Sequence, residues 1–212
     1  AVASFTDNDV LNLYGYTYFP QKWSLEAYEF LIKQGTVISK SFLNSILVTF
    51  MGTALGIMVT VLLAYTISRK ELVGRKLIML FVFFTMLFNG GMVPTYLMYT
   101  QIFHIKNTMW ALLFPHLLVN GFNVLLVRTF FNENIPEVLL EAARIDGAGE
   151  ISIFRNVVLP ISKPILATIG LLVGVGYWND WYNGLLFVTD VNYYTCLLYT
   201  SDAADAGLGV DL

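Results

Sequence analysis

The chain has 212 residues, of which 57% are hydrophobic and only 13% are charged, and its formal net charge is −3. Soluble domains carry about a quarter of charged residues, so this composition excludes an ordinary soluble globular domain. A soluble fold of this length has too little interior for so much apolar surface, and a lipid bilayer is the solvent that accommodates it. The small negative charge indicates no particular partner, and no nucleic acid is expected.

Residues 1–35 are rich in tyrosine, tryptophan and phenylalanine. Tyrosine and tryptophan favour the boundary between lipid and water, so we expect an external loop region that is partly structured at the membrane surface. Direct contact with an external partner is the alternative. No hydrophobic leader precedes this region, and we therefore expect that an upstream span is missing and that the chain is a fragment.

Four apolar runs follow and predict an all-α, polytopic transmembrane helical bundle over residues 36–194. The runs cover about 37–67, 77–103, 108–131 and 163–187. About 20 apolar residues cross the hydrocarbon core, so the first three runs qualify as spans without reservation. The fourth qualifies if Asp180 lies near an interface or faces a cavity lined by protein.

The first two runs contain glycine patterns that affect helix packing. Gly52 and Gly56 lie four residues apart, a spacing that lets two helices approach closely in lipid. We expect packing against a neighbouring helix, with a specific dimer interface as the alternative. The second run is interrupted by the segment 89–94, which holds two glycines and a proline. Either the helix ends near Phe88 and a short helix follows an external loop, or the break lines a transport pathway.

The last two runs carry polar residues. In the third run we expect His116 and Asn120 to bond a neighbouring helix. The fourth run includes a cluster of aromatic, amide and carboxyl side chains at 178–183. This cluster suits a sugar, which has an apolar face and a rim of hydroxyl groups, and it equally suits an interfacial aromatic belt. The residues that would line a substrate pathway are Asn89, Tyr96, Trp178, Asn179 and Asp180.

Basic residues indicate which connections are cytoplasmic. Those at the first and third connections are Arg69, Lys70, Arg75 and Lys76, and Arg128, Arg144, Arg155 and Lys163. The second connection holds only Lys106. Cytoplasmic loops are enriched in lysine and arginine, so residues 132–162 are predicted to be cytoplasmic and residues 1–35 external.

Residues 132–162 are polar but ordered in pattern. Pro136 suits the first turn of a helix, and Glu137 and Glu141 would place negative charge near its positive end. Asp146-Gly147 is a natural break, and a second helical stretch ends at Pro160. A short helix with a small-residue face fits a groove on a partner protein, whereas a solvated loop needs no such order.

No catalytic or metal-binding motif accompanies these segments. The chain has no GxxxxGK[ST], HExxH or GxSxG motif, and its single cysteine is Cys196. We predict no catalytic residue, no metal and no cofactor. Energy for uphill transport would then come from another subunit or from an ion gradient. An ion gradient favours buried acidic residues in the spans, and only Asp180 comes close.

Residues 132–162 resemble the EAA loop of the integral-membrane subunits of binding-protein-dependent ABC importers, and are called the EAA segment from here on. The loop pattern is EAA, three residues, G, nine residues, I, one residue and LP. The chain matches it at Glu141, Ala142, Ala143, Gly147, Leu159 and Pro160, with Val157 in place of isoleucine. Stretches at 88–96, 135–137, 159–164 and 176–179 are similar to the carbohydrate-uptake branch, and the likeness extends over about residues 5–194.

The resemblance implies a MetI-like permease of six spans, of which this chain holds about four, and a pathway formed with a second permease subunit. It implies that the EAA segment is a cytoplasmic coupling loop which docks on a dimer of ATP-binding subunits. The docking residues would be Glu141, Ala142, Ala143, Asp146, Gly147, Val157, Leu159 and Pro160. Glu141 would pair with a basic residue of the ATPase, and Gly147 would allow close backbone approach.

The family further implies that an extracytoplasmic solute-binding protein delivers a sugar or oligosaccharide. The chain would be a multi-pass protein of the bacterial plasma (inner) membrane, in contact with lipid and without enzymatic activity of its own. Residues 195–212 do not resemble the family, so we expect a missing last span and a non-native tail. The alternative to this function is a secondary transporter, or another polytopic membrane protein whose cytoplasmic loop is only structural.

Overall fold

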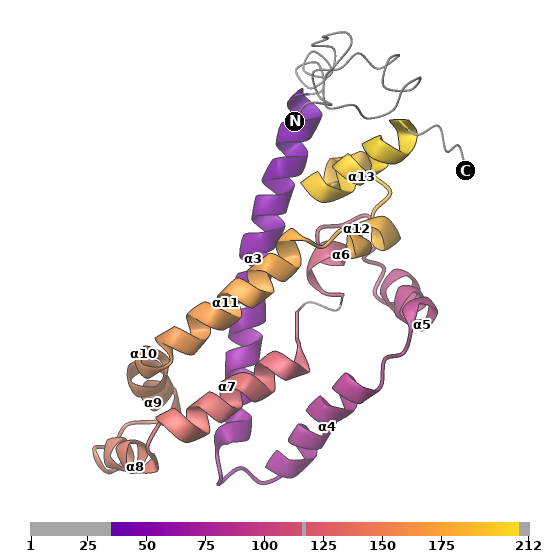
Figure 1. Ribbon diagram of the computed structural model, residues 1–212. Coiled ribbons are helices and arrows are strands. Elements are labelled where there is room, and N and C mark those ends of the chain that lie inside the picture. The colour runs from indigo at the N-terminus through magenta and orange to yellow at the C-terminus, as the bar shows by residue number, and fades with distance from the viewer. Residues whose placement is uncertain (1–34, 116–117, 208–212) are drawn as a thin grey trace, which may run out of the picture.

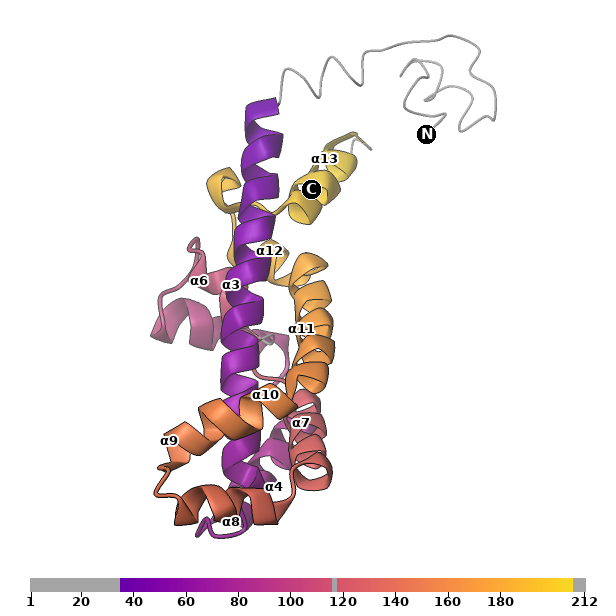
Figure 2. The same ribbon diagram turned by 90° about the vertical axis from the view of Figure 1, so that its left-hand side faces the viewer.

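The computed structural model describes residues 35–115 and 118–207, which are helical with short connections. The loop expected over residues 1–35, except its last residue, and the side chain of His116 lie outside the described residues. One helix, α3 (Gly35–Ser68), extends along the whole molecule (Figures 1 and 2). At 1.5 Å per residue it is about 50 Å long, which is enough to cross a bilayer unaided.

The described residues contain further candidate crossings only as bent pairs of helices. Helix α4 (Arg75–Leu87) and the following Met92–Ile102 stretch meet at 115°, and Glu150–Ile161 meets α11 (Lys163–Trp178) at 80°. By length and composition, α3 can cross alone, and up to three crossings result if each bent pair counts as one. The described part therefore contains fewer continuous crossings than the four predicted, because several apolar runs are broken.

The second run breaks where the sequence predicts a break. Helix α4 ends at Leu87, and α5 (Met92–Leu97) continues into a π-helical turn, η2 (Met98–Ile102). Gly91 lies between them with φ +81°, a backbone conformation that glycine adopts without strain. The helix thus ends close to Phe88, and a second short helix follows it.

The third run, predicted as a span over about 108–131, is not a single helix in the described residues. It contains α6 (Trp110–Leu113) and α7 (Gly121–Asn134), and the described residues 114–115 and 118–120 between them are not helical. Pro115 lies at the end of α6, where it cannot donate a backbone hydrogen bond. The side chain of Asn120 accepts a hydrogen bond from the Phe122 amide at 2.9 Å and so caps α7, rather than bonding a neighbouring helix.

The fourth run is also shorter than the predicted 163–187. Helix α11 ends at Trp178, and α12 (Tyr182–Phe187) follows after a turn. A 3₁₀ turn, η4 (Val191–Tyr193), then leads to α13 (Cys196–Gly207), which lies beside the first half of α3 (Figure 1). The amide of Cys196 donates to the Ser45 hydroxyl at 2.8 Å, which fixes the start of α13 against α3.

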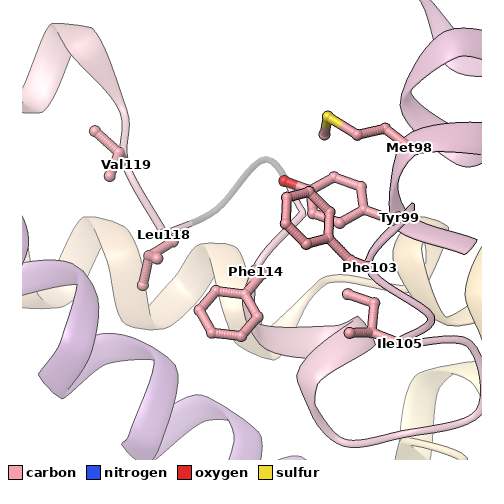
Figure 3. Close-up of a pocket in the computed structure, with 7 residues that line it drawn as sticks. All are labelled: Met98, Tyr99, Phe103, Ile105, Phe114, Leu118 and Val119. Carbon is pink, nitrogen blue, oxygen red and sulfur yellow. The ribbon is translucent and has the colours of Figure 1, made fainter.

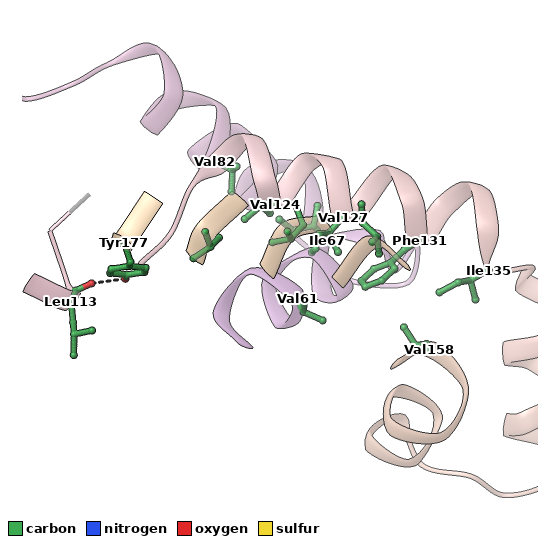
Figure 4. Close-up of a cluster of buried hydrophobic side chains, with 14 of the residues drawn as sticks. Val61, Ile67, Val82, Leu113, Val124, Val127, Phe131, Ile135, Val158 and Tyr177 are labelled. Atoms are coloured by element: carbon green, nitrogen blue, oxygen red, sulfur yellow. Dashed lines mark hydrogen bonds between the residues drawn. The ribbon is translucent and has the colours of Figure 1, made fainter. Parts of the chain in front are cut away.

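The core forms where α3 packs against α11 and α7. Valine and isoleucine side chains from the three helices meet in one cluster with Phe131 and Tyr177 (Figure 4). A Cβ added at Gly52 would lie 2.5 Å from the Tyr177 ring, so this glycine makes room for an aromatic side chain of α11. The Tyr177 hydroxyl in turn donates to the carbonyl of Leu113 at 2.7 Å. The GxxxG pattern therefore serves packing within the chain, as predicted.

Candidate functional site

The EAA segment forms a chain of short helices at one end of the molecule (Figure 2). They are α8 (Glu137–Ile145), α9 (Glu150–Ile153), the π-helical turn η3 (Phe154–Val158) and α10 (Leu159–Ile161). Pro136 is the N-cap of α8, with ψ 132°, and so lies one residue before the first turn. Gly147 has φ +80° and forms the break between α8 and α9, where the sequence predicts it.

Ion pairs attach α8 and α9 to the end of α3 and to the α3–α4 connection. Lys70 Nζ lies 2.6 Å from Glu137 Oε2. Arg144 joins two carboxylates, with Glu71 Oε1 at 2.5 Å and Glu150 Oε1 at 2.9 Å. Two of the three pairs, Lys70–Glu137 and Arg144–Glu71, join residues far apart in the sequence. These two pairs fix the position of the EAA segment and are not merely local contacts of a solvated loop.

Tyr65 and Arg69, at the end of α3, contact Glu150 directly. The Tyr65 hydroxyl donates to Glu150 Oε2 at 3.0 Å, and an Arg69 nitrogen lies 3.8 Å from the same oxygen. Arg69 also donates to the Tyr65 hydroxyl and stacks over the Tyr65 ring, with 4.2 Å from Cζ to the centroid. Motion of α9 is therefore coupled to the last turn of the one unbroken long helix among the described residues.

The charges of this network have shifted pKa values. Hydrogen bonding and charge attraction from Lys70 lower the pKa of Glu137. Partial burial acts to raise the pKa of Glu150, but hydrogen bonds from Tyr65 and Arg144 outweigh it and the net shift is downward. Hydrogen bonds to Glu71 and Glu150 raise the pKa of Arg144. Each shift favours the ionised form, so the network is charged at neutral pH.

Apolar side chains anchor the inner face of the EAA segment. Leu140, Ile153 and Val158 are buried in the core cluster, and Ala143 and Val157 pack against it. The predicted docking residue Leu159 also packs against this cluster. Three of the eight predicted docking residues, Ala143, Val157 and Leu159, therefore support the segment from within and do not form its outer surface.

The outer face of α8 and α9 exposes apolar side chains. Val138, Ile145 and Ile151 are 73%, 86% and 84% exposed. Glu141 and Ala142 are also exposed on α8, and Asp146, Gly147 and Pro160 are exposed beyond it. An exposed apolar patch on a segment already anchored by its other face is typical of a protein–protein contact site.

Glu141 differs from the other carboxylates of this region. Glu71, Glu137 and Glu150 each form an ion pair, whereas Glu141 has no hydrogen-bond or ion-pair partner among residues 35–115 and 118–207. A carboxylate in this position is available to a basic group on another molecule. The face thus combines apolar contact area, the small side chain of Ala142 and the carboxylate of Glu141, which is unpaired among the described residues.

The residues predicted to line a substrate pathway lie in more than one place. Asn89 is at the break between α4 and α5 and accepts a hydrogen bond from the Gly91 amide at 3.1 Å. The ring of Tyr96, on α5, stacks on Phe187 of α12 with 5.8 Å between centroids. The three others surround the end of α11. Trp178 contacts Phe42 of α3 edge-on at 6.0 Å, Asn179 caps α11, and Asp180 accepts two hydrogen bonds from Asn183.

Two cavities lie at the broken helices. One, of about 440 Å³, is lined by Thr85, Met86, Phe88, Asn89, Gly90, Val119, Asn120 and Gly121. It therefore lies between the break of the second apolar run and the break of the third. The other, of about 580 Å³, is apolar and lies between η2 and the segment after α6 (Figure 3). Non-helical backbone at membrane depth is tolerated where it lines such a cavity.

The sequence reasoning missed the partners of the EAA segment. The sequence indicates Lys70 only as one of the basic residues of the first connection. It carries no signal for Glu71 or Glu150. These ion pairs join residues 67 and 73 positions apart, and no local pattern reports them. No group of three or more histidine, cysteine or acidic residues suited to a metal ion occurs in the described part of the chain.

Comparison with known proteins assigns the chain to a family. The family described as "Binding-protein-dependent transport system inner membrane component" matches residues 40–194. This range is most of the chain and includes α3, the EAA segment and α11. The chain therefore belongs to this family of membrane permease components, as the EAA pattern indicated.

The chain is similar to curated bacterial proteins, one of which is named as a transport system permease. The chain is 42% identical over 171 residues to the polygalacturonan/rhamnogalacturonan transport system permease protein YtcP of Bacillus subtilis (strain 168), covering 81% of this chain and 58% of that protein. It is 39% identical over 172 residues to the protein LplC of the same organism, covering 81% and 57%. The chain thus spans less than two thirds of the length of these relatives.

A solved structure supports the same arrangement of helices. The crystal structure of a bacterial ABC transporter involved in the import of the acidic polysaccharide alginate superposes with a TM-score of 0.84 at 25% sequence identity. The superposition covers 100% of this chain and 73% of that one. The fold of this chain has therefore been observed in the crystal structure of a bacterial ABC transporter.

Proposed function

We propose that this chain is the membrane-spanning permease subunit of an ATP-driven, binding-protein-dependent importer of a sugar or oligosaccharide. The observation that carries the proposal is the outer face of α8, where Glu141, which has no partner among the described residues, lies among exposed Val138, Ala142 and Ile145. Membership of the family supports the transport role, and the name of the relative YtcP supports the substrate class. The protein would act in the bacterial inner membrane as a multi-pass subunit without enzymatic activity of its own.

The partners follow from this function. A dimer of cytoplasmic ATP-binding subunits would bind the outer face of α8, with the Gly147 turn close to its surface. A second permease subunit would complete the pathway, and an extracytoplasmic binding protein would deliver the solute. The many large apolar side chains exposed on α4 and α5 are consistent with further helices or lipid around this part of the fold.

The geometry supports a mechanical role for the EAA segment. A force on α8 is resisted by its ion pairs to Lys70 and Glu71 and by the contact of Glu150 with Tyr65. Displacement of α8 would therefore move the end of α3 instead of distorting a loose loop. Such motion switches the pathway only if nucleotide and binding protein contact the two states differently.

We also propose that the solute passes the cavity between the broken second and third apolar runs. Asn89 from the second run and Asn120 from the third both line this cavity, and both carry amide groups suited to hydroxyl groups of a sugar. Tyr96 and the Trp178–Asp180 cluster would contact the solute at other positions along the pathway. The alternative, a secondary transporter, has no supporting observation in the described residues.

Charge reversal at Glu141 tests the docking role. In the full-length protein assembled with its partner subunits, Glu141→Lys should leave basal ATP hydrolysis by the ATPase measurable but reduce substrate-stimulated hydrolysis and uptake by about tenfold or more, since a buried interfacial ion pair becomes a repulsion. The measurement is sugar uptake and ATP hydrolysis in proteoliposomes.

The matched control is Glu133→Lys, which reverses an exposed carboxylate at the end of α7 instead of on α8. Uptake should stay near the wild-type rate in this control. Full uptake by the Glu141→Lys complex would show that the outer face of α8 does not dock on the ATPase. Uptake in the absence of any ATPase would instead support the secondary transporter.

A further inference from the structure

A polar cleft of about 460 Å³ lies between the ends of α3 and α7, the start of α4 and the inner side of α8. Its lining includes five basic residues and three carboxylates. The basic residues are Arg69, Lys70, Arg75, Arg128 and Arg144, and the carboxylates are Glu71, Glu133 and Glu137. The docking face of α8 points away from this cleft, so the proposed contact with the ATPase does not account for it.

The charges of the cleft are only partly neutralised by one another. Glu71 and Glu137 are held in ion pairs by Arg144 and Lys70. Arg75 and Arg128 have no hydrogen-bond or ion-pair partner among the described residues. The third carboxylate of the cleft, Glu133, forms no ion pair with either arginine. Two guanidinium groups, each with several donors in a planar fork, thus line the cleft without an ion pair among the described residues.

Arg128 gives the stronger evidence that the cleft binds an anion. Its Nε atom is shielded from solvent and has no hydrogen-bond partner within the described part of the chain. The Nε of Arg69, on the same cleft, is in the same condition. A buried charged donor without an acceptor is costly, and bidentate binding of a phosphate or carboxylate group would satisfy it.

The position of the two free arginines along their helices favours a lipid as the source of that anion. Arg128 follows the apolar stretch 124–127 of α7, and Arg75 precedes the apolar remainder of α4. Both residues therefore lie where a hydrophobic segment meets a polar end, which is the depth of lipid headgroups. A soluble anion would not require this placement.

The surface beside the cleft suits acyl chains. Exposed apolar side chains on the flank of α4 next to Arg75, at 100° per residue, are Leu80, Phe83 and Leu87. Their exposed fractions are 68%, 43% and 76%. A molecule with a negative head and apolar tails would match the cleft and this helix flank together.

We propose that the cleft binds the phosphodiester headgroup of an anionic phospholipid, held by Arg75 and Arg128 with its acyl chains along α4. The positive-inside pattern places this end of the bundle in the cytoplasmic leaflet, where anionic lipid attracts basic residues. The bound lipid would join α4 to α7 beside the ion pairs that hold α8, and so support the same end of α3.

Native mass spectrometry of the full-length transporter complex in detergent tests this proposal. The complex is titrated with palmitoyl-oleoyl phosphatidylglycerol and, separately, with palmitoyl-oleoyl phosphatidylcholine, which has the same tails and no net charge. We expect preferential retention of phosphatidylglycerol. Arg128→Gln and Arg75→Gln should each weaken its retention by about five- to tenfold, since a single charge-assisted contact is lost.

Two controls make the result specific. Lys163→Gln removes an exposed basic residue at the start of α11, outside the cleft, and should leave retention unchanged. Arg128→Lys keeps the charge and should retain most binding if Arg128→Gln has not simply misfolded. Arg75 lies at the start of α4, on a different helix from Arg128, so its variant is an independent test if the Arg128 variants fail to assemble.

Competition with inorganic phosphate distinguishes a bound lipid headgroup from a bound free anion. Inorganic phosphate at millimolar concentration should not displace the lipid if the acyl chains contribute to binding. Complete displacement would overturn the lipid proposal and indicate a site for a small anion. Equal retention of both lipids, or retention unaffected by both arginine variants, would overturn the proposal. None of these outcomes depends on uptake, so failure here is distinguishable from failure of the proposed transport function.

Discussion

At the scale of single residues, two glycines are required for different physical reasons. Gly52 is required for space, because the Tyr177 ring occupies the position where a Cβ would lie. Gly147 is required for conformation, because its φ of +80° is strained for other residues while the space around it is open. Only the second of these glycines lies at the surface proposed to dock on the ATPase.

Gly147→Ala therefore tests backbone conformation without a steric clash. We expect a loss of about 1–2 kcal/mol of local stability at the turn between α8 and α9, because alanine disfavours the left-handed region. Coupling of ATP hydrolysis to uptake in the assembled transporter should fall, while the overall amount of assembled protein stays close to wild type.

Gly149→Ala is the matched control. Gly149 has φ −71° and no atom within 4 Å of an added Cβ, so alanine fits there without strain. Equal coupling in the two variants would mean that the positive φ at Gly147 is not needed. For both variants, coupling is measured as sugar uptake and ATP hydrolysis in proteoliposomes.

At the scale of elements, the EAA segment depends on charges that its own sequence does not contain. Helix α8 meets Lys70 and Glu71 of the α3–α4 connection, and α9 meets Tyr65 of α3. Each pair is largely exposed, so its separate contribution is small, and the arrangement depends on several pairs acting together. Arg144, which joins two of the carboxylates, is the centre of this arrangement.

The network should loosen in acid. The pKa values of Glu137 and Glu150 are lowered in the folded protein, so the stabilisation is present above the ordinary glutamate value of 4.5 and is lost as pH falls through the lowered values. Glu150→Gln should produce part of this loosening at neutral pH. High salt should reduce the difference between the variant and wild type.

The measurement is the distance distribution between spin labels at Val73 and Ile151, which are 96% and 84% exposed, in a background with Cys196 replaced by serine. The distribution should broaden below pH 4.5 and in Glu150→Gln. Arg155→Gln, which removes an exposed charge outside the network, serves as control. A distribution that is unchanged in acid and in Glu150→Gln would argue against the ion pairs as the anchor.

At the scale of the whole molecule, broken helices surround one continuous helix. Helix α3 is unbroken over 34 residues, while the runs on either side of the cavity at Asn89 and Asn120 are interrupted. Interruption exposes backbone polar groups that must be satisfied by capping, by protein or by water. The breaks are therefore where we propose that water and a polar solute enter the bundle.

A cysteine at position 89 tests this arrangement. In the assembled transporter lacking Cys196, Asn89→Cys should react with a charged, water-soluble thiol reagent, because the thiolate forms only where water reaches it. Leu80→Cys, on the exposed apolar face of α4, should react much more slowly because lipid or a partner helix covers it. Labelling is followed by mass, and saturating solute should slow it at position 89.

Equal reaction at both positions, or none at position 89, would remove the cavity from the proposed pathway. Reaction at position 89 that the solute leaves unchanged would restrict the cavity to water access. The two positions lie in the same apolar run, so differences in expression affect them alike.

The sequence predicted the helical class, the break near Phe88 and the turn at Gly147, because glycine and proline act locally. It predicted a span over about 108–131 but not its division into α6 and α7, since a run of apolar residues does not report whether its backbone turns. It identified the EAA pattern but not which members face inward. Burial of Val157 and Leu159 depends on packing against distant helices, which the local pattern does not contain.

Helix α3 has a further consequence for communication between the two sides of the membrane. Near its start, Lys40 and Asn44 bond Asn192 and the Tyr194 carbonyl, and near its end Tyr65 bonds Glu150. Because α3 is a rigid helix with contacts near both ends, a tilt at one end shifts the other end. Binding of a partner at the external end of α3 and binding of the ATPase at the end near Tyr65 would then bias the same tilt of α3. By thermodynamic reciprocity, each binding event would change the affinity of the other by the same factor.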